Sequence, residues 1–320
     1  MGKATKKDSW IDTLRSVFGL RRGHGLVILT YHRMLAQADP VINDVYAQMF
    51  DQQLSVLAKY FNPLRVTEAV DLLNRGKIPP RAVCITFDDG YRDNHDVALP
   101  LLQKWSVPAT FFVATDYMQG KNMWNDIIIN SFRKVAQDTY DLSHFDLGVY
   151  QLSSPASRQA AAYSVLGQWK YKSVEERNQL AMQLSEYMGV VESERLMMTA
   201  DEVKQLSSMG MEVGAHTVTH PILQNVEERV ARAEMQKSKS ELETVIGKSV
   251  SAFAYPNGRV EKDYSSSHVN MAKELGFDSA VTTNWGKATP GGNQFELPRL
   301  GFPEANPLKF GLKMARAYLQ

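Results

Sequence analysis

The sequence contains almost no cysteine and no long hydrophobic run. Of its 320 residues only Cys84 is a cysteine, which excludes an internal disulfide framework and a cysteine-rich zinc module. No stretch approaches the roughly 18–20 uninterrupted apolar residues of a membrane-spanning helix. These absences favour a chain that folds around an ordinary hydrophobic core, and a hydrophobic share of 44% is large enough to supply one.

Net charge is also nearly absent. Lysine and arginine number 36, aspartate and glutamate number 35, and the formal net charge is +1. Such a chain has no overall field that attracts nucleic acid, so we expect no nucleic-acid partner. A secretory pattern is missing as well, since no apolar stretch of roughly 7–15 residues precedes a small-residue cleavage site. We therefore expect a cytoplasmic protein, and the sequence says nothing of its oligomeric state.

Positive charge is concentrated in the N-terminal segment, residues 1–24. Residues 1–22 carry six lysines or arginines and two acids. The apolar residues of this segment recur at the spacing of one helical face: Trp10, Ile11, Leu14, Val17 and Phe18. An amphipathic basic helix of this kind suits the surface of an anionic membrane, here its inner face. The alternative is a helix that closes the bottom of a barrel.

Seven short β-rich runs are predicted after this segment. They are Leu26–His32, Ala82–Asp89, Ala109–Thr115, Met211–His216, Val250–Pro256, Ser279–Asn284 and Leu297–Phe302. Several are nearly continuous apolar, which is typical of strands buried on both faces of a parallel sheet. Segments with helical spacing lie between them, so we predict an α/β fold. Because the standard TIM barrel has eight strands, these seven suggest a reduced or distorted barrel over residues 25–320.

One block interrupts the alternation of strands and helices. From about residue 117 to residue 200 no convincing strand occurs, and helices are expected at Trp124–Val135, Pro155–Trp169 and Val174–Met188. We interpret the block as a helical insertion after the third strand. In barrels such insertions lie on the active-site face, so we expect this one to shape the substrate site. Trp124 is a candidate for stacking on a sugar ring, with a place in the core of its helix as the alternative.

Two adjacent carboxylates, Asp88 and Asp89, end the second run in the sequence TFDDG. Neighbouring residues of a strand point to opposite faces, but Gly90 lets the chain turn at this point. A simple turn is one interpretation, since Asp-Gly is common in turns. A turn needs only one aspartate, however. The functional interpretation assigns one carboxylate to a metal ion and the other to proton transfer.

Two histidines end the fourth run in the sequence HTVTH. In an extended strand His216 and His220 would lie roughly 13 Å apart, too far to share one ion. We therefore expect the strand to end near His216 and the chain to curl back before Pro221. Because strand ends converge in a barrel, the two imidazoles and the Asp89 carboxylate are predicted to meet. Three protein ligands leave coordination positions open, which is typical of a catalytic metal site.

The chemistry of such a site is metal-assisted hydrolysis of an acyl group. A bound divalent cation would acidify its water and polarise a carbonyl oxygen. Asp88 beside it could then take the proton from the attacking water. A third motif, FAYPNG, ends the fifth run in a strong turn signal. A tight turn at a strand end also presents backbone N–H groups, which could stabilise an oxyanion.

In this order, and with an ATFF strand between the first two, the motifs TFDDG, HTxxH and FAYPNG resemble those of the polysaccharide deacetylases of carbohydrate esterase family 4. The resemblance covers roughly residues 26–302 apart from the insertion. It implies a distorted (β/α)7 TIM-like barrel and metal-dependent removal of N-acetyl, sometimes O-acetyl, groups from glycans that contain N-acetylhexosamine.

The resemblance also implies roles for individual residues. Asp88 matches the general base of the family. Asp89, His216 and His220 match the ligands of a divalent metal ion, and zinc is the ion we expect first. Asn257 falls where the family has the backbone amide that stabilises the oxyanion. Tyr255, in the same motif, is expected in the oxyanion and substrate region.

Three positions depart from the family pattern. Ala254 stands where the family usually has an arginine that orients the base, and Arg299 is the candidate to supply this charge. The late leucine-x-histidine motif, source of the general acid, is replaced by Leu297-Pro298-Arg299-Leu300. The aspartate that would orient that histidine is matched at best by Asp278. The general acid must therefore come from elsewhere or be dispensable.

His32 is the candidate for the missing acid. It ends the first run, so it should reach the same barrel face as the metal ligands. The sequence resembles a subgroup of these deacetylases whose first strand ends in Tyr-His and whose late histidine is lost. A histidine can protonate a leaving amine near neutral pH. A histidine that only caps the strand is the alternative.

Taken together, the residues and the resemblance predict a sugar N-deacetylase of envelope or exopolysaccharide synthesis. Its substrate would be an acetylated polysaccharide or oligosaccharide, or a lipid-linked glycan. One alternative is an esterase or amidase that acts on a non-glycan acyl group. Another is a weakly active glycan-binding relative, which is disfavoured because Asp88 and all three metal ligands are retained.

Overall fold

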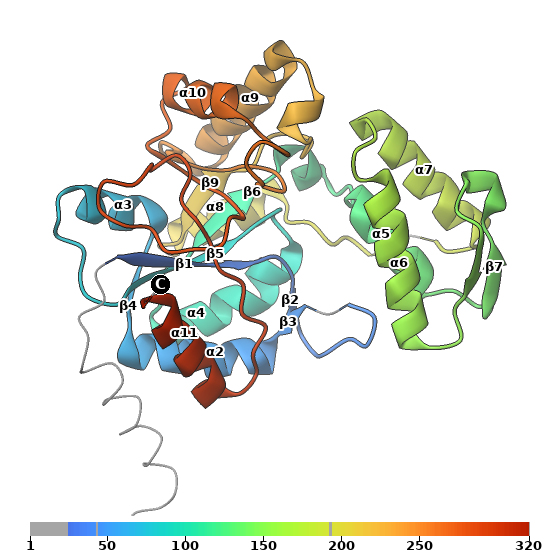
Figure 1. Cartoon of the computed structure of the whole chain (residues 1–320), viewed down its shortest axis with the longest axis horizontal. Helices are drawn as coiled ribbons and strands as arrows, with labels where there is room; N and C mark the ends of the chain where they lie inside the picture. The colour runs from blue at the N-terminus through green and yellow to red at the C-terminus, as the bar shows by residue number, and fades with distance from the viewer. Residues whose placement is uncertain (1–24, 43, 192–193, 320) are drawn as a thin grey trace, which may run out of the picture.

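The computed structural model describes residues 25–42, 44–191 and 194–319 (Figure 1). The predicted N-terminal helix, residues 1–24, lies outside these described residues. Within the described ranges, no helix is both long enough and apolar enough to cross a membrane.

A parallel sheet of short strands forms the centre of the molecule. Its order is β1 (Leu26–Tyr31), β5 (Ala82–Phe87), β6 (Thr110–Val113), β9 (Glu212–Ala215), β10 (Ala252–Ala254) and β11 (Ser279–Val281). All neighbours in this order pair in parallel, and the sheet curls, which confirms the predicted α/β barrel-like fold. A further strand, β4 (Asn62–Leu64), pairs with the start of β5. The sequence analysis missed β4, which is short and contains Pro63, a residue that strands tolerate only at an edge.

The seventh predicted run joins the two ends of the sheet without forming a regular strand. Leu297 forms a bridge with Val281 of β11, and Leu300 forms one with Leu29 of β1. The Leu300 N–H donates to the carbonyl of Ile28 at 2.8 Å. Pro298 lacks an N–H, so a continuous ladder cannot form here. The segment nevertheless places its side chains between β11 and β1.

Helices and short elements surround the sheet. The helices are α2 (Ala47–Tyr60), α3 (Val66–Asn74), α4 (Leu99–Trp105), α8 (Ala200–Ser208), α9 (Glu228–Ile246), α10 (Ser266–Glu274) and α11 (Pro307–Ala317). The short elements are β2 (Met34–Leu35), β3 (Val45–Tyr46), a π-helical turn at Asn94–Ala98 and 3-10 turns at Thr115–Gln119 and Leu223–Asn225. A further 3-10 turn, Ser143–Phe145, lies in the insertion between its two short strands. Helix α9 ends at Gly247, whose φ of 67° is the left-handed cap that glycine adopts without strain.

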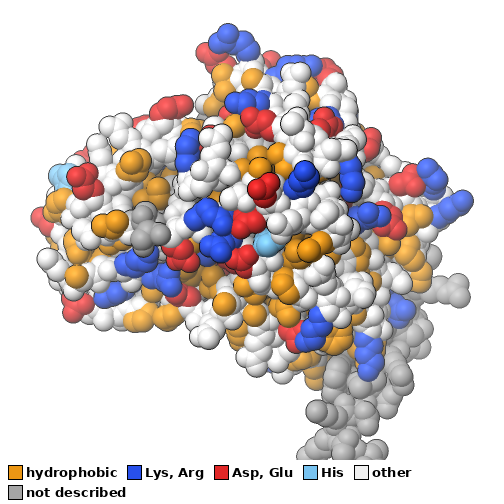
Figure 2. All heavy atoms as spheres, turned by 180° about the vertical axis from the view of Figure 1, so that it is seen from behind, with side chains coloured by type: hydrophobic (Ala, Val, Ile, Leu, Met, Phe, Trp, Pro, Cys, Tyr) orange, Lys and Arg blue, Asp and Glu red, His pale blue; other side chains and the backbone are white. Residues whose placement is uncertain are grey.

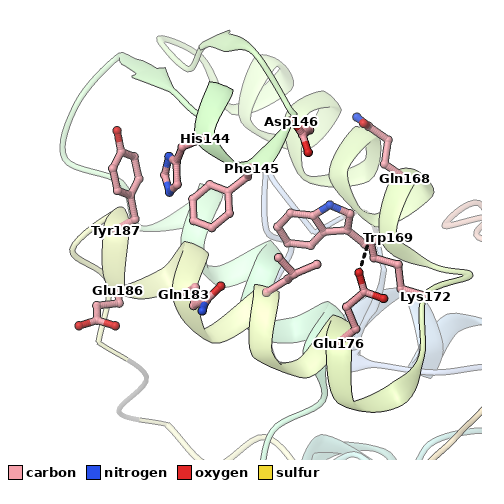
Figure 3. Close-up of a pocket in the computed structure, with 11 residues that line it drawn as sticks. His144, Phe145, Asp146, Gln168, Trp169, Lys172, Glu176, Gln183, Glu186 and Tyr187 are labelled. Carbon is pink, nitrogen blue, oxygen red and sulfur yellow. Dashed lines mark hydrogen bonds and ion pairs between the residues drawn. The ribbon is translucent and has the colours of Figure 1, made fainter.

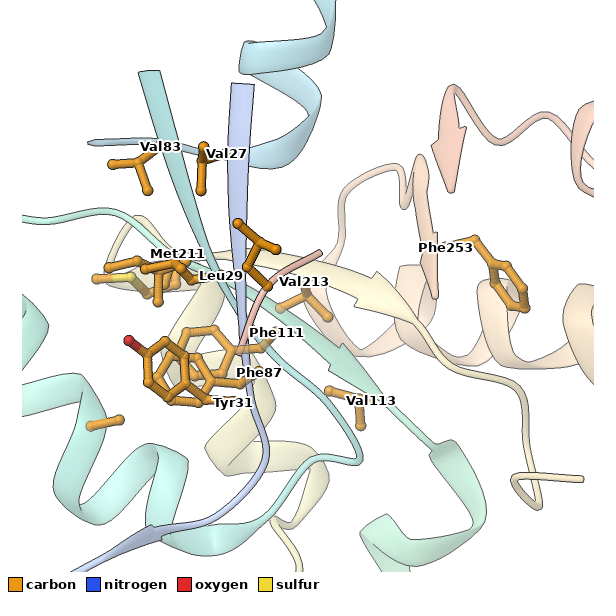
Figure 4. Close-up of a cluster of buried hydrophobic side chains, with 14 of the residues drawn as sticks. Val27, Leu29, Tyr31, Val83, Phe87, Phe111, Val113, Met211, Val213 and Phe253 are labelled. Carbon is orange, nitrogen blue, oxygen red and sulfur yellow. The ribbon is translucent and has the colours of Figure 1, made fainter. Parts of the chain in front are cut away.

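Side chains alternate between two cores along the central strands. On β5, Val83 and Phe87 point outward into the cluster under the helices, where Phe87 stacks on Phe111 with ring centroids 4.8 Å apart (Figure 4). Cys84 points inward to a smaller cluster that includes Phe112. The interior is narrow, because a Cβ on Gly214 would lie 2.5 Å from the Phe112 ring. This alternation decides which side chains reach the inside of the barrel at its carboxyl end.

The insertion lies beyond the carboxyl end of the sheet (Figure 1). Its helices are α5 (Trp124–Arg133), α6 (Pro155–Trp169) and α7 (Val174–Tyr187), close to the predicted spans. They enclose a hydrophobic cluster of their own. The prediction of no strand in this block was wrong, since β7 (Thr139–Asp141) and β8 (Val149–Gln151) form an antiparallel hairpin. Strands of three residues are too short to show an alternating pattern in the sequence.

Candidate active site

The two carboxylates that follow β5 lie at the carboxyl end of the barrel. Asp88 continues the inward-facing series of Ala82, Cys84 and Thr86, so it points into the barrel. Asp89 has a φ of 75°, and this left-handed turn brings its carboxylate to the same end of the barrel. Gly90 follows with a φ of 91°. A single turn thus places two neighbouring carboxylates in one site, and both are buried.

The histidine loop has the predicted shape. Strand β9 ends at Ala215, and positive φ angles of 64° at Thr217 and 54° at His220 curl the chain back. Glu234 of α9 holds the loop from outside, because its carboxylate accepts the N–H groups of Val218 and Thr219, each at 2.8 Å. The rings of the two histidines consequently lie with their centroids 4.8 Å apart.

Asp89, His216 and His220 form a group that fits a metal ion. The Nε2 atoms of both histidines lie 3.4 Å from Oδ1 of Asp89. The Nδ1–H of His216 donates to the carbonyl of Ala254 at 2.8 Å, which leaves its Nε2 free as a ligand. Burial lowers the pKa of His220 to about 3, so this imidazole is neutral, as a ligand must be. Two imidazole nitrogens and one carboxylate are a donor set that zinc and similar divalent ions accept.

A second group of potential ligands, His95, Asp96 and Glu202, does not fit a cation. Arg92 already lies 2.8 Å from the Asp96 carboxylate, and Arg195 lies 2.7 Å from Glu202. The two guanidinium groups therefore already neutralise the carboxylates that a metal ion would need as ligands.

Asp88 is held by Arg299. The Nη1 and Nη2 atoms of Arg299 donate to the two carboxylate oxygens at 2.7 and 2.6 Å, and its Nε donates to the carbonyl of Thr282. Burial by itself would raise the pKa of Asp88, but the charge and the hydrogen bonds of Arg299 outweigh it and bring the pKa below its ordinary value. The guanidinium absent at Ala254 thus comes from the segment between β11 and β1, at the place where the family pattern has its late histidine.

His32 follows the last residue of β1 and lines the same cavity as the carboxylates and the metal-ligand group. Its side chain is exposed. It lies near enough to Asp88 and Asp89 for its charge to act on both carboxylates. Asp278, by contrast, directly precedes β11 and so lies at the opposite end of the strand from the site. It cannot orient a group there.

Of the two residues of the FAYPNG turn that were expected at the site, only Asn257 lines the cavity. Asn257 has a φ of 61° and lines the cavity, as does Thr283 beside it. Tyr255 does not reach the cavity, and the prediction that placed it in the substrate region was wrong. Its ring is buried and stacks on Tyr264 with centroids 4.0 Å apart. The physical reason is alternation, since Phe253 and Tyr255 both point outward from β10 into the cluster under the helices.

These groups open into a cavity of about 460 Å³ between the barrel and the insertion. Trp124 lies on its wall but is only 6% exposed, and the Arg177 guanidinium covers its ring at 5.2 Å. This favours the core interpretation of Trp124. The wall residues that the sequence analysis missed include Tyr163 of α6, Lys170 directly after α6 and Arg177 of α7. No motif marks them, because helical spacing does not reveal what a helix faces.

A larger cavity of about 760 Å³ lies within the insertion (Figure 3). Phe145, Trp169 and Tyr187 contribute rings to it, and Glu176 and Lys172 form an ion pair at its edge. None of its lining residues belongs to the groups of potential metal ligands found among the described residues. The convergence of titratable groups, and not the size of the cavity, therefore identifies the candidate site.

Comparison with known proteins decides the family. Residues 75–280 match the family model described as polysaccharide deacetylase. The chain belongs to the polysaccharide deacetylase family. This agrees with the TFDDG and HTxxH motifs, both of which fall inside the matched region.

Two relatives of this family member illustrate the range of similarity. YxkH of Bacillus subtilis, named for the same family, is 22% identical over 241 residues, which are 75% of this chain and 58% of that protein. The poly-beta-1,6-N-acetyl-D-glucosamine N-deacetylase of Staphylococcus epidermidis is 31% identical over 83 residues, 26% of this chain and 28% of that protein. The chain thus spans less than two thirds of the length of either relative.

Solved structures show the same fold. The deacetylase PplD of Streptococcus pyogenes, solved with acetate, superposes with a TM-score of 0.61 at 23% identity and covers 91% of this chain and 98% of that one. IcaB of Ammonifex degensii gives a TM-score of 0.57 at 20% identity and covers 93% and 98%. The polysaccharide deacetylase fold therefore extends over nearly the whole described chain.

Proposed function

We propose that this polysaccharide deacetylase family member is a metal-dependent hydrolase that removes N-acetyl groups from N-acetylhexosamine units of a glycan. One observation carries the proposal. An ionised, arginine-held Asp88 lies directly beside a three-ligand group, and both open into a cavity large enough for a sugar. A base next to a metal site with open positions is the arrangement that hydrolysis of an amide requires.

Asp89, His216 and His220 would hold the metal ion, for which we propose zinc. Bound there, a divalent cation would lower the pKa of the attacking water and polarise the carbonyl of the acetamido group. Burial by itself would raise the pKa of Asp89, but the hydrogen bond from His216 contributes most to bringing it well below its ordinary value. The carboxylate is therefore ionised and available as a ligand at any physiological pH.

The remaining steps belong to side chains and backbone around the metal group. Asp88 accepts the proton of the attacking water, and Arg299 keeps this carboxylate ionised and fixed in orientation. The backbone N–H at Asn257 donates to the oxygen that becomes negative. His32 gives a proton to the leaving nitrogen as the bond between carbon and nitrogen breaks. The products are acetate and a free amine on the sugar.

The glycan assignment is supported by the relatives. Several carry the name poly-beta-1,6-N-acetyl-D-glucosamine N-deacetylase, and we extend their substrate class, an N-acetylated glycan of exopolysaccharide metabolism, to this chain. Tyr163, an exposed aromatic residue on the cavity wall, offers a surface for a pyranose ring. The basic residues 1–22 suit a location at the inner face of the membrane, where lipid-linked glycans are available.

Acetate release tests the proposal. The full-length protein, stripped of metal and then supplied with zinc, is assayed on N-acetylglucosamine oligomers, on a lipid-linked N-acetylated sugar and on a non-sugar acetyl ester. We expect zinc-dependent acetate release from the sugars. Release from the ester alone would identify a non-glycan esterase instead, and glycan binding without any release would identify a binding protein.

A further inference from the structure

We infer that the substrate carries an anionic group, a phosphate or a carboxylate, close to the acetylated sugar, and that Lys170 and Arg177 bind this group. The inference rests on the proposed function and names the class of glycan. Both residues belong to the insertion and line the wall of the active-site cavity.

The charges that line this cavity do not balance once the catalytic groups are accounted for. Asp88 is neutralised by Arg299, and Asp89 belongs to the metal-ligand group. The other lysine and arginine side chains on the wall are Lys170 and Arg177, and no further carboxylate lines it. The part of the cavity that faces the insertion is therefore positive.

Arg177 is a buried cation on which the charges of Glu175 and Glu234 act only from beyond ion-pair distance. Its side chain is 2% exposed. One nitrogen, Nη2, donates to the carbonyl of His220 at 2.6 Å, while the buried Nε has no hydrogen-bond partner among the described residues. No carboxylate of the described chain forms an ion pair with it. A buried, unpaired charge is costly to maintain, and the planar guanidinium fork matches the oxygens of phosphate and carboxylate groups.

Lys170 adds a second positive charge at the same wall. It is half-buried and forms no ion pair with any described carboxylate. Burial and the nearby charges of Arg259, Lys262 and Arg177 together lower the pKa of Lys170, against the opposing effect of Asp263. Asp263 is itself fully buried, and one of its oxygens accepts the backbone N–H of Arg259. Its other oxygen, Oδ1, has no hydrogen-bond partner, and Asp263 forms no ion pair with Lys170 within the described chain.

Many cations elsewhere on the described surface have carboxylate neighbours, among them Lys104, Lys121 and Arg232. Figure 2 shows one face of the molecule on which blue and red side chains lie next to each other. Lys172, only two residues after Lys170, forms an ion pair with Glu176 at 2.5 Å and lines the cavity inside the insertion. A lysine two residues away, on the wall of the other cavity, thus has the carboxylate partner that Lys170 lacks.

A neutral N-acetylglucosamine polymer would leave both cations unpaired in the complex. A glycan with an anion beside the acetamido sugar would pair them. Two sources share this chemistry, the diphosphate of a lipid-linked glycan and the carboxylate of a uronic acid within a polymer. Binding through charge also predicts sensitivity to salt, because ions screen attraction between partly exposed charges.

The test compares three substrates on the full-length, zinc-loaded protein. They are a neutral N-acetylglucosamine trimer, the same trimer with a diphosphate at its reducing end, and an oligomer that alternates N-acetylglucosamine with glucuronic acid. We expect kcat/KM for at least one anionic substrate to exceed that for the neutral trimer by roughly 10- to 100-fold, the range for hydrogen bonds to charged groups. Added sodium chloride should reduce this preference.

Substitutions on the cavity wall test whether Lys170 and Arg177 cause the preference for an anionic substrate. Lys170→Met should bring the ratio of anionic to neutral kcat/KM close to one, and Arg177→Met should do the same where metal content shows that the loop of His220 is intact. Lys172→Met is the matched control and should keep the wild-type ratio. Preference for the diphosphate would identify a lipid-linked source, and preference for the uronate a polymer source.

Equal kcat/KM for neutral and anionic substrates in the wild-type protein would overturn the inference and leave the proposed function standing. A preference that survives in Lys170→Met and in Arg177→Met would overturn it as well. Absence of acetate release from all three substrates would contradict the proposed function itself, and this inference with it.

Discussion

The barrel and the insertion contribute to the same cavity in different ways. In the barrel each site residue follows a strand, so its direction is set by alternation along that strand and by one turn at its end. In the insertion Tyr163, Lys170 and Arg177 reach the cavity from helices that pack around a separate hydrophobic cluster. The barrel thus supplies groups in fixed positions for chemistry, while the insertion supplies a wall that touches them through the bond of Arg177 to the carbonyl of His220.

This division predicts that substitutions at strand ends change the rate of the reaction or the metal content. Substitutions in the insertion should instead change substrate preference or stability. The largest effect is expected at the metal group. His216→Ala removes one of three ligands and leaves the carbonyl of Ala254 without its hydrogen-bond donor. Both the bound zinc and the activity should therefore be lost. Elemental analysis after gel filtration measures the metal. One equivalent of zinc in the variant would contradict the assignment.

Asp88→Asn should separate the base from the ligand beside it. The amide cannot accept the proton of water, so the rate should fall by roughly 10²–10⁴, the contribution of a positioned acid–base group. Metal content should stay at the wild-type value, because the ligand group does not include Asp88. Asp89→Asn is the matched control, in which metal should be weakened. Loss of metal from Asp88→Asn would mean that the two carboxylates share or exchange these roles.

Arg299→Gln should shift the pH dependence of the reaction. Arg299 lowers the pKa of Asp88, so its removal lets burial raise this pKa. The base is then protonated at a higher pH, and the acidic limb of the kcat/KM profile should move upward. The rate at a pH above that limb should fall much less than in Asp88→Asn. An acidic limb that stays in place while the protein remains folded would show that Arg299 does not tune the base.

His32→Ala should remove the alkaline limb of the same profile. The proton for the leaving amine is then missing at every pH, so the remaining activity should no longer fall at high pH for this reason. Metal content should not change, since His32 is not in the ligand group. An unchanged profile would assign the general acid elsewhere and leave His32 as a strand-capping residue.

The smallest effect on activity is expected from Asp126 of α5. Burial raises its pKa to about 7 from an ordinary value of 3.8, so the folded state binds this proton more tightly than the unfolded state. Binding of this proton stabilises the folded state fully below pH 3.8, and this stabilisation is lost as the pH rises from there through about 7. Asp126→Asn should therefore raise the thermal midpoint at pH 8 relative to wild type, and the gain should shrink toward pH 4. A gain that does not depend on pH would contradict the assignment.

The two regions also differ in how far the sequence predicts them. Asp89, His216 and His220 could be placed together because the ends of parallel strands meet at one end of a barrel. Arg299 could be proposed because a charge was missing at Ala254, but its two-pronged contact with Asp88 depends on the irregular segment beside Pro298. Tyr255 was misplaced because it shares a motif with Asn257, whereas the alternation that continues from β10 directs its side chain outward.

The insertion was predicted only as three helices. The hairpin of β7 and β8 is too short for a pattern, and Trp124 could be given two opposite roles from its sequence context alone. Arg177 shows why the rest could not be predicted. Nothing in the spacing along α7 distinguishes a buried arginine that contacts the carbonyl of His220 from an ordinary surface arginine, because the contact is made by the packing of one region on the other.

The hydrogen bonds between Glu234 and the histidine loop affect the free energy of metal binding. A loop that must be ordered when an ion arrives loses conformational entropy at that moment, which weakens binding. Here the carboxylate of a helix on the outside of the barrel already fixes the N–H groups of Val218 and Thr219, between the two histidines. The ordering is complete before the ion binds. The affinity for the metal is therefore set in part by a side chain that never touches it.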